Sequence, residues 1–525
     1  MRNHSFVNRL VSGHRGAAHT GDVMKALKTI LLAGGALVVM AAAAQAADIP
    51  TKKAAPAPAP VCFNDFWSYL NTSPADCPLR IPGAGITVTG RADWGVSAET
   101  NGASFNYRGP DAIAPVISNV AKGAKFELAP GMMGQSFVSL KGVWPVGGDV
   151  KLIAEWSIAF DPYTMQLGDG EGADIDNNWH TAALRPSTPG SSSYGGQWDN
   201  RLGYVGVQSD TFGTVKVGRL MTFMNELAGQ YDPTGGSYGF SLLGYSGNLS
   251  SGFGVTETNR YNLGGSYLWD NKTFHLGGET QFGGYNVGND AEYMYQFDAG
   301  AKIGDLNIDG IYAHATDALA LNMFSAQPAG NFGFVSTPND LTATVTNYDA
   351  FAVMARYKIQ QFTIFGGYLH TDMSNPTDSY YTGGVNNVLW SQANVISNTY
   401  LPGSITSTGF PQDKILQHVW IGGKYSFSPS FDLMAGYWHV WQNYFDTNSA
   451  VTQAADCATA ANGVGTVSSK CNGTEDAFSI SAIWRPVKRI DVYGGVIYSQ
   501  VNGGIASGYQ VNNNTSFNGG IRLNF

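Results

Sequence analysis

The chain from Gly85 onward repeats one pattern, in which about ten residues alternate between apolar and polar and a turn or loop follows. Successive side chains of a β-strand point to opposite faces of a sheet, so each such segment predicts a strand with one apolar face. Sixteen segments fit the pattern. Their approximate spans are 85–98, 134–144, 149–160, 199–209, 213–220, 259–269, 273–283, 293–303, 306–315, 348–358, 362–372, 414–427, 431–442, 475–485, 489–500 and 515–525.

The connections between these segments alternate in length. Seven are short, such as "PVGG", "DNK" and "SPS", and eight are long, including 161–198, 221–258, 316–347 and 373–413. An even strand number with short turns at one end and long loops at the other is typical of outer-membrane barrels. We therefore predict an all-β fold, a 16-stranded antiparallel transmembrane β-barrel over residues 85–525 with short periplasmic turns, long external loops and periplasmic termini.

The two faces of each predicted strand keep the same character along the chain. In the third strand, Leu152 and Trp156 lie on one face, whereas Lys151 and Glu155 lie on the other. A soluble sandwich would bury its apolar face against a second sheet and would need much shorter loops. We therefore expect the apolar faces to contact lipid and the polar faces to line a water-filled lumen.

Composition favours a membrane protein over a large soluble one. Charged residues make up 13% of the chain, about half the usual share, and aromatic residues make up 12%. After residue 46 no run of 18 apolar residues could form a spanning helix. A membrane location then requires a closed barrel, which pairs every backbone group.

Residues 24–46 have the three parts of an export signal. Lys25 and Lys28 form a basic start, "TILLAGGALVVMAAA" is apolar, and "AQA" fits cleavage before Ala47. A short transmembrane anchor is the alternative, but the run is short and ends in small residues. We expect translation to begin at Met24, so that residues 1–23 would be an upstream extension.

The segment 47–84 is expected to precede the barrel in the periplasm. Its "KKAAPAPAPV" reads as an extended Ala/Pro-rich tether, because alternating Ala and Pro resist helix and sheet. Four cysteines in an exported chain suggest two local disulfides out of three possible connectivities. We predict the pairs Cys62–Cys77 and Cys457–Cys471.

Net charge excludes one class of partner. Without residues 1–46 the chain would hold 25 Lys and Arg and 38 Asp and Glu, a net charge of −13. Such a chain is a poor ligand for nucleic acid.

The region from Gln197 to Gly247 carries the most specific likeness to a known family. It contains "DNRLGYVGV", "FGTVKVGR" and "YDPTGGSYGFSLLGYSG" in this order, and "FDPYTMQLGDG" and "DCPLRIPGAGITVTGRADWG" precede them. The chain thus resembles the general trimeric outer-membrane porins of the alphaproteobacterial type. The resemblance implies a homotrimeric, passive, water-filled channel in the bacterial outer membrane. Its partners would be outer-membrane lipid, lipopolysaccharide, and the small hydrophilic solutes and ions that diffuse through it.

The third long loop, about 221–258, interrupts the strand pattern with Gly, Met and aromatic residues. An ordinary surface loop would not carry such apolar side chains. The resemblance implies that this loop folds back into the lumen and narrows it. Its "LMTFMNEL" would form a short helical turn, and its apolar residues would pack against the inner barrel wall.

The resemblance also implies a constriction in which loop acids oppose wall bases. By position in the motifs, the acids are Glu226 and Asp232, and the bases are Arg219 and Arg260. Alternation adds four further candidates for the basic wall, namely Arg91, Lys141, Arg201 and Arg522. Opposed charges would create a transverse field that orients dipolar solutes and hinders bulky apolar ones.

Three of these assignments have alternatives. Strict alternation places Arg219 on the lipid side with Val215 and Val217, where an Arg costs about 2–4 kcal/mol at the bilayer midplane. We expect a bulge at Gly218 to turn Arg219 inward, and a position at the rim is the alternative. The loop acids could instead be solvated loop charges, and the wall bases Arg91 and Arg260 could lie elsewhere in the lumen.

The last segment, "SFNGGIRLNF", ends on Phe525. It resembles the terminal strands of outer-membrane proteins generally, in which the assembly machinery reads the final aromatic residue. Phe525 is therefore the expected assembly signal.

No motif indicates an enzyme. "GGSYG", residues 235–239, matches G-x-S-x-G, but a nucleophile elbow requires a strand before it and a helix after it. The histidines show no H-E-x-x-H pattern, and neither cysteine pair has zinc-ligand spacing. A barrel-embedded hydrolase would need a Ser–His pair on neighbouring strands, and none can be derived. We expect no catalytic residue, no metal and no cofactor.

Two other functions stay open beside passive diffusion. A sugar- or carboxylate-selective channel would present an aromatic track, and His418, Trp420 and Lys424 share one face of a predicted strand. An anchoring barrel would attach through the start of the tether, Ala47 and Asp48, to peptidoglycan. Net charge and the loop acids predict a weak preference for cations, which a basic wall could reverse locally.

Overall fold

The computed structural model of the chain describes part of its length. The described residues are 62, 64–102, 115–117, 121, 123–163, 165, 201–243, 260–281, 293–318, 321–322, 341–343, 346–374, 411–446, 457, 467–468, 470–506 and 509–525. They belong to one compact unit, Cys62–Phe525. The expected leader and tether lie outside the described residues. Among the helices of the described part, none is long and apolar enough to span a membrane.

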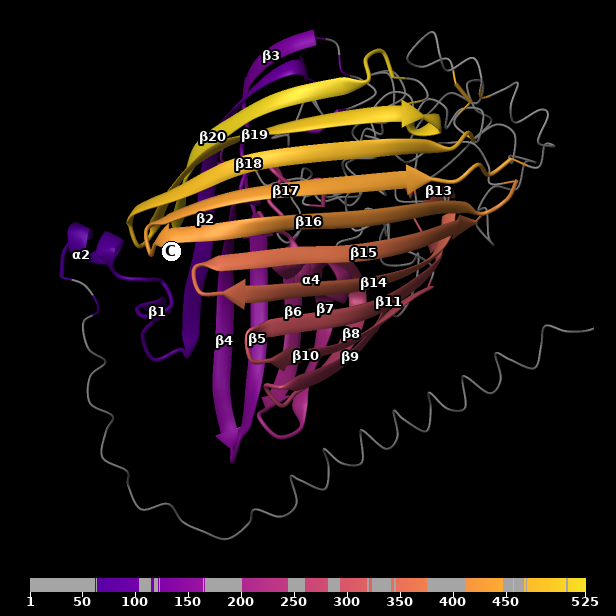
Figure 1. Cartoon of the computed structure of the whole chain (residues 1–525). Helices are drawn as coiled ribbons and strands as arrows, with labels where there is room; N and C mark the ends of the chain where they lie inside the picture. Colours follow the sequence, from indigo (N-terminus) through magenta and orange to yellow (C-terminus); the bar gives the residue numbers. More distant parts are fainter. Residues whose placement is uncertain are drawn as a thin grey trace, which may run out of the picture. The chain divides into compact units, whose positions relative to one another are not determined.

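Sixteen antiparallel strands form a closed ring, in which the last strand pairs with the first (Figure 1). The strands of the ring are β2 (Ile86–Gly102), β4 (Phe137–Gly147), β5 (Val150–Ala159), β6 (Leu202–Ser209), β7 (Gly213–Met221), β8 (Arg260–Asp270), β9 (Phe274–Gln281), β10 (Tyr293–Ile303), β11 (Leu306–Ala318), β14 (Thr346–Ile359), β15 (Phe362–Ser374), β16 (Lys414–Ser428), β17 (Phe431–Gln442), β18 (Gly473–Val487), β19 (Ile490–Gly503) and β20 (Asn513–Asn524). This ring confirms the predicted fold class.

Alternation located the strands well, and the sheet adds pieces that alternation did not reveal. Each predicted segment overlaps one strand of the ring, and 293–303 and 431–442 match β10 and β17 at both ends. The unpredicted pieces are β1 (Leu79–Ile81) and β3 (Gly123–Leu128), which pair with β2, the small pair β12 (Leu321–Asn322) and β13 (Leu341–Ala343), and the 3-10 turn η5 (Gly504–Ala506).

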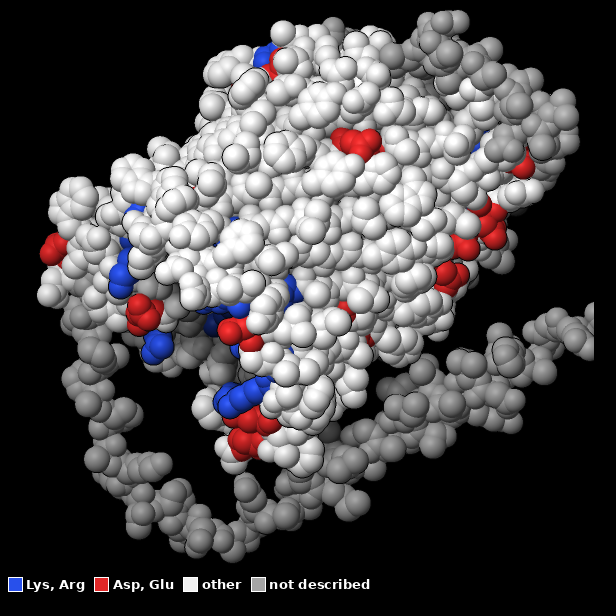
Figure 2. All heavy atoms as spheres, in the orientation of Figure 1, with Lys and Arg blue, Asp and Glu red and all other residues white. Residues whose placement is uncertain are grey.

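The apolar faces of the strands point outward, as predicted. Along β5, Leu152 and Trp156 are exposed, whereas Glu155 is buried on the inner side. Many other large apolar side chains of the ring are exposed in the same way, including Val205, Val353 and Ile521. Figure 2 shows one face of the molecule with a broad area almost free of charged side chains and with Lys, Arg, Asp and Glu mainly toward its ends. Such a surface suits lipid.

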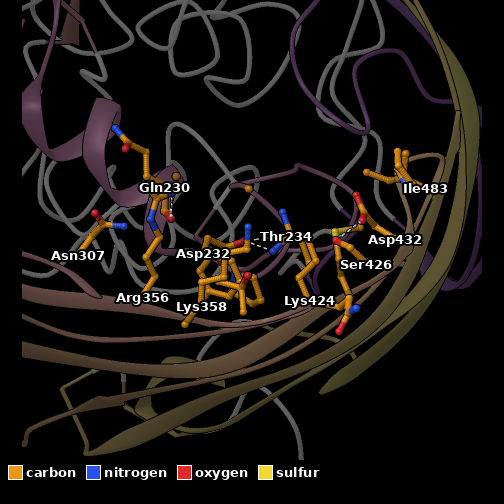
Figure 3. Close-up of a pocket in the computed structure, with 18 of the residues that line it drawn as sticks. Gln230, Asp232, Thr234, Asn307, Arg356, Lys358, Lys424, Ser426, Asp432 and Ile483 are labelled. Carbon is orange, nitrogen blue, oxygen red and sulfur yellow. Dashed lines mark hydrogen bonds between the residues drawn. The ribbon is translucent and has the colours of Figure 1, made fainter. Parts of the chain in front are cut away.

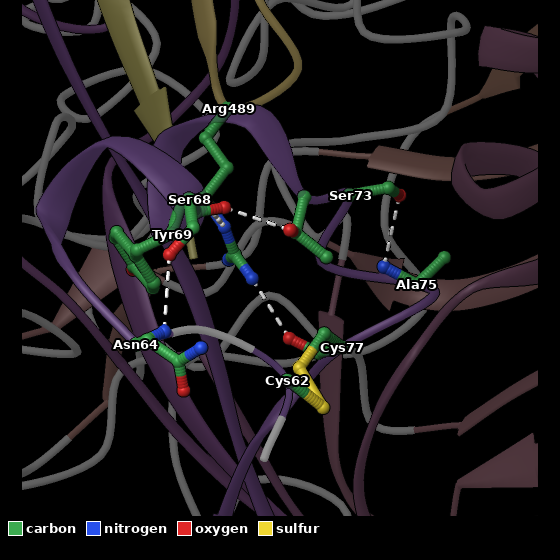
Figure 4. Close-up of a disulfide and its surroundings, with 9 residues drawn as sticks. Cys62, Asn64, Ser68, Tyr69, Ser73, Ala75, Cys77 and Arg489 are labelled. Atoms are coloured by element: carbon green, nitrogen blue, oxygen red, sulfur yellow. Dashed lines mark hydrogen bonds between the residues drawn. A yellow bond between two sulfur atoms is a disulfide. The ribbon is translucent and has the colours of Figure 1, made fainter. Parts of the chain in front are cut away.

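Both predicted disulfides are present, between Cys62 and Cys77 and between Cys457 and Cys471. The first closes a segment that contains α2 (Phe66–Asn71), whose start is capped by Asp65 through a 2.8 Å hydrogen bond from the Ser68 amide. Arg489, from the turn between β18 and β19, holds this segment (Figure 4). Its fully buried guanidinium donates to the carbonyl oxygens of Tyr69 and Cys77 at 2.8 and 2.7 Å.

The carboxyl terminus completes the ring at the short-turn end. Phe525 exchanges backbone hydrogen bonds of 2.8 and 2.9 Å with Gly90 of β2. A Cβ on Gly90 would lie 2.6 Å from Phe525 Cζ, so the ring packs over the space that this glycine leaves. The role of Phe525 as an assembly signal stays a prediction.

Candidate pore and its constriction

The third long connection turns into the barrel directly after β7. Thr222 caps α4 (Phe223–Tyr231), and its side chain accepts a hydrogen bond from the Asn225 amide. Pro233 follows two residues after the helix ends, where the chain can no longer continue helically. The expected helical turn in "LMTFMNEL" is therefore present, within a longer helix.

Apolar side chains of this connection form the core of the molecule together with the inner wall. The buried members from the connection include Met224, Tyr231, Leu242 and Leu243. They share a cluster with inward side chains of the strands, including Met294, Ile311, Trp420 and Trp438. This packing explains why the loop is apolar, and it confirms that the third loop folds into the lumen.

Hydrogen bonds fasten the loop to wall strands along much of the ring. The amides of Phe223 and Met224 donate to Glu279 of β9 and Gln296 of β10, at 2.8 and 3.0 Å. The Tyr231 hydroxyl donates to Asp309 of β11. Further on, the Trp420 indole donates to the Tyr231 carbonyl, the Ser479 hydroxyl to the Phe240 carbonyl and the Asn518 amide to the Gly239 carbonyl. The loop is therefore held in one place against the wall.

Asp232 is the centre of the loop rather than a charge presented to the lumen. The residue is 1% exposed. One carboxylate oxygen accepts from the amides of Thr234 and Gly236 and from the Thr234 hydroxyl, and the other accepts from the Ser241 hydroxyl and the Trp438 indole. Burial raises the pKa of Asp232, and these donors oppose the rise. The structure thus gives Asp232 a different position from the expected pore-facing one.

Glu226 does face a basic wall across the lumen. It lies in the first turn of α4, where the helix dipole favours an acid, and its side chain is exposed to the lumen. Because the side chain lies deep within the barrel, desolvation raises the pKa of Glu226. The charges of Lys216, Arg201 and Lys141 on β4 to β7 oppose that rise. The loop acid and wall bases predicted for the constriction are brought together here.

The basic wall is itself partly neutralised by Glu155 of β5. Arg201 Nη1 and Lys141 Nζ lie 3.8 and 3.7 Å from the carboxylate oxygens of Glu155. Arg201 also donates to Ser157 Oγ at 3.0 Å and stacks over the Phe137 ring, 3.8 Å from its centroid. Lys216, which the sequence did not single out, lies over the Tyr204 ring. These contacts fix the wall charges in position.

The remaining sequence candidates lie in different places. Arg91 and Arg522 line the lumen, where Arg91 donates to the Gln135 carbonyl and Arg522 pairs with Asp491 at 2.8 Å. Arg260 begins β8 opposite Met221, and its side chain lies outside the described residues.

Arg219 remains on the lipid-side parity at the end of β7. The pairing of β7 with β8 does shift register between Gly218 and Leu220. The pairing with β6 stays regular, however, and sets Arg219 opposite Gly203, on the same parity as Val205. The expected irregularity therefore exists beside Arg219 without changing its parity against β6. Its side chain is half-buried.

A cavity of about 1120 Å³ opens beneath the third loop. It is bordered by Gln230, Asp232 and Thr234 of the loop and by the turns at the short-turn end, including Asp305 and Pro429. Figure 3 shows Arg356, Lys358 and Lys424 on the wall beside these loop residues. Seven Lys or Arg residues line the cavity, against three Asp residues. The bases are Arg91, Lys302, Arg356, Lys358, Lys424, Arg485 and Arg522, and the acids are Asp232, Asp305 and Asp432.

Part of this positive charge has no acid to balance it. Arg485 pairs with Asp432 and Asp491, at 2.8 and 3.4 Å. By contrast, Lys302, Lys358 and Lys424 form no ion pair with a carboxylate of the described residues. Lys358 and Lys424 lie opposite Thr363 on its two neighbouring strands, so they flank one residue at one height. Sequence analysis missed Lys302, Arg356 and Lys358, although all three have inward parity on correctly predicted strands.

The expected aromatic track is covered. His418 and Trp420 are each 3% exposed, and the Trp420 indole is bonded to the third loop. Of that trio, only Lys424 lines the cavity. Likewise, "GGSYG" lies within the third loop, where Ser237 Oγ is buried and donates to Thr234 Oγ1.

The closed barrel with an inward loop agrees with the family comparison, in which the Gram-negative porin family matches residues 33–524. The chain belongs to this family. It is therefore a channel of the Gram-negative outer membrane and not an enzyme. No curated protein matches the porin.

Two solved structures show how far the porin fold extends. The porin is similar to the anion-selective porin from Comamonas acidovorans, with 14% identity and a TM-score of 0.51, over 84% of this chain and 99% of that chain. It is also similar to OmpT, an outer membrane protein of Vibrio cholerae, with 12% identity and a TM-score of 0.49, over 86% and 100%. At these identities the likeness shows the fold alone.

Proposed function

We propose that this porin is a passive diffusion channel for small hydrophilic solutes that prefers anions. The observation that carries the proposal is the excess of basic over acidic residues around the cavity beneath the third loop. Net charge of the whole chain, −9, suggests the opposite preference. An ion in the lumen responds mainly to charges within about one Debye length, roughly 8–10 Å at physiological salt, and outer charges are screened. The lining should therefore decide the sign.

Coulomb's law sets the expected size of the preference. One unit charge at about 10 Å in bulk water contributes about 0.4 kcal/mol, and screening at about 0.1 M salt reduces this to roughly a third. Four excess positive charges, the difference between the seven bases and three acids of the lining, then favour an anion by about 0.6 kcal/mol. We expect a permeability ratio of anion to cation of about three to ten.

The reversal potential in a KCl gradient across a planar bilayer tests the proposal. The expected reading is a chloride preference that strengthens as the salt concentration falls, because screening weakens. A reversal potential on the potassium side at all concentrations would contradict the proposal. It would show that Glu226 and the external acids govern selection.

We also propose that the porin is a homotrimer of the alphaproteobacterial type. The support for this is the resemblance carried by the region from Gln197 to Gly247. The same bilayer recordings should show voltage-induced closure in three equal steps. Closure of each inserted channel in a single step would indicate independent monomers.

The other functions named from the sequence are less well supported. The covered positions of His418 and Trp420 leave no aromatic track for a sugar. Attachment to peptidoglycan through Ala47 and Asp48 stays a prediction, because the tether lies outside the described residues.

A further inference from the structure

Three side chains that are common metal ligands meet on the inner wall beside α4. They are His275 of β9, Asp298 of β10 and Asp309 of β11. His275 Nε2 lies 3.0 Å from Asp298 Oδ2 and 2.6 Å from Asp309 Oδ1, and all three ligand atoms lie within 4.8 Å of one another. We propose that this cluster binds a divalent transition-metal ion, with Zn²⁺ as the best-suited one. The inference is independent of the ion preference of the channel.

The strand register builds the site around a glycine. His275 and Asp309 both lie directly opposite Gly300 of β10, one on each neighbouring strand. Their side chains meet over Gly300 because it has none of its own. A Cβ there would lie 1.6 Å from Asp309 Oδ1 and 2.3 Å from His275 Cε1. Asp298 comes from the same strand, two residues earlier, and therefore on the same face.

The carboxylates of this cluster are poorly satisfied without a cation. The Asp298 side chain is fully buried, and neither of its oxygens accepts a hydrogen bond from a described residue. Asp309 Oδ1 also has no such donor. His275 Nε2 can carry only one hydrogen, so it cannot donate well to both aspartates at once. Buried carboxylates that lack donors are costly, and a divalent ion between the three atoms would balance them.

The neighbouring residues orient the ligands. The Tyr231 hydroxyl, at the end of α4, donates to Asp309 Oδ2, which leaves Oδ1 directed toward His275. Such outer contacts commonly fix metal ligands. Because Tyr231 belongs to the third loop, an ion bound here would also tie that loop to β9, β10 and β11.

The ligand set indicates which metals fit. One imidazole and two carboxylates suit Zn²⁺ and its first-row neighbours, and they are too few oxygens for a tight Ca²⁺ site. Zinc–ligand bonds are about 2.0–2.2 Å, so two ligands at right angles are about 3 Å apart, close to the 3.0 Å between Nε2 and Asp298 Oδ2. The His275 side chain is 22% exposed, so ions in the lumen can reach it.

Two other His–Asp pairs of the barrel provide matched controls. His314 and His439 each contact a single carboxylate, that of Asp349 at 2.8 Å and that of Asp476 at 2.7 Å. Each has one histidine and one acid, and neither has the third ligand. Loss of His439 should therefore leave the proposed binding unchanged.

Isothermal titration of the untagged, full-length porin with ZnCl₂, after removal of bound metal by EDTA, tests the proposal. We expect one Zn²⁺ per chain, with an affinity that falls at least about 100-fold in H275A and in D298N. H439A should titrate like the wild type. Absence of Zn²⁺ binding to the wild type, or equal binding in H275A and the wild type, would overturn the proposal and leave a protonated His275 as the balancing charge.

Gly300→Ala provides a second variant that keeps all three ligands. Its methyl group would occupy the space over which His275 and Asp309 meet, so binding should weaken although no ligand is lost. Heat-modifiable migration in gels and unchanged channel conductance would show that H275A, D298N and G300A have folded. Wild-type affinity in a folded G300A would contradict the geometry proposed here.

Discussion

Replacement of residues 224–240 by a short Gly-Ser linker should raise single-channel conductance at least about twofold, because an α-helix with its side chains fills a column about 10–12 Å across. These residues contain most of α4 and the turn around Asp232, which lie against the inner wall. Conductance in planar bilayers and the size limit for neutral polyethylene glycols would both report the wider pore. If both stayed at wild-type values, the third loop would not form the constriction.

A deletion of equal length in an external loop serves as the control. Residues 379–395 lie in the long connection between β15 and β16, and their removal should leave the size limit unchanged. Because the first deletion uncovers Trp420 and Trp438 on the wall, a milder variant is also needed. Asp232→Ala removes the acceptor of five hydrogen bonds and should release the loop without shortening the chain. We expect noisy, larger openings, since each unmet buried donor costs about 1–3 kcal/mol.

The fold could be predicted from sequence because one physical rule governs every strand of a membrane barrel. Lipid outside and water inside force alternation at each position, and β10 and β17 were located to the residue on that rule alone. Short pieces such as β1 and β3 were missed, because they lie beside β2 at the barrel ends, where neither face is fully in lipid. Arg219 shows a further limit, since a register shift on one side of a strand need not change its pairing on the other.

The site was less predictable because it depends on height and on loop contacts, which alternation does not report. Parity assigns Lys302, Lys358 and Lys424 to the lumen, but only the register shows that two of them flank Thr363 beneath the loop. Asp232 looked like a pore acid in the sequence. Its burial follows from partners such as Ser241 and Trp438, which lie up to 206 residues away. Glu226 was identified correctly because the first turn of an inward helix must face the lumen or the wall.

Replacement of Lys302, Lys358 and Lys424 by Glu should reverse the ion preference of the porin, from chloride to potassium. The lining would then hold four bases and six acids instead of seven bases and three acids. Since these three side chains form no ion pair with a carboxylate of the described residues, the change removes no ion pair there. Reversal potentials in a KCl gradient would measure the effect, which should be largest at low salt.

The control for this reversal changes the net charge of the chain by the same amount outside the cavity. Arg80, Lys272 and Lys488 are exposed residues of β1 and of two short turns, and none lines the cavity. Their replacement by Glu should leave chloride preferred, because charges beyond about one Debye length are screened. If both triple variants shifted the reversal potential equally, selection would follow the overall charge of the molecule rather than its lining. If neither did, the selective charges would lie higher in the lumen, where Glu226 faces Lys216 and Arg201.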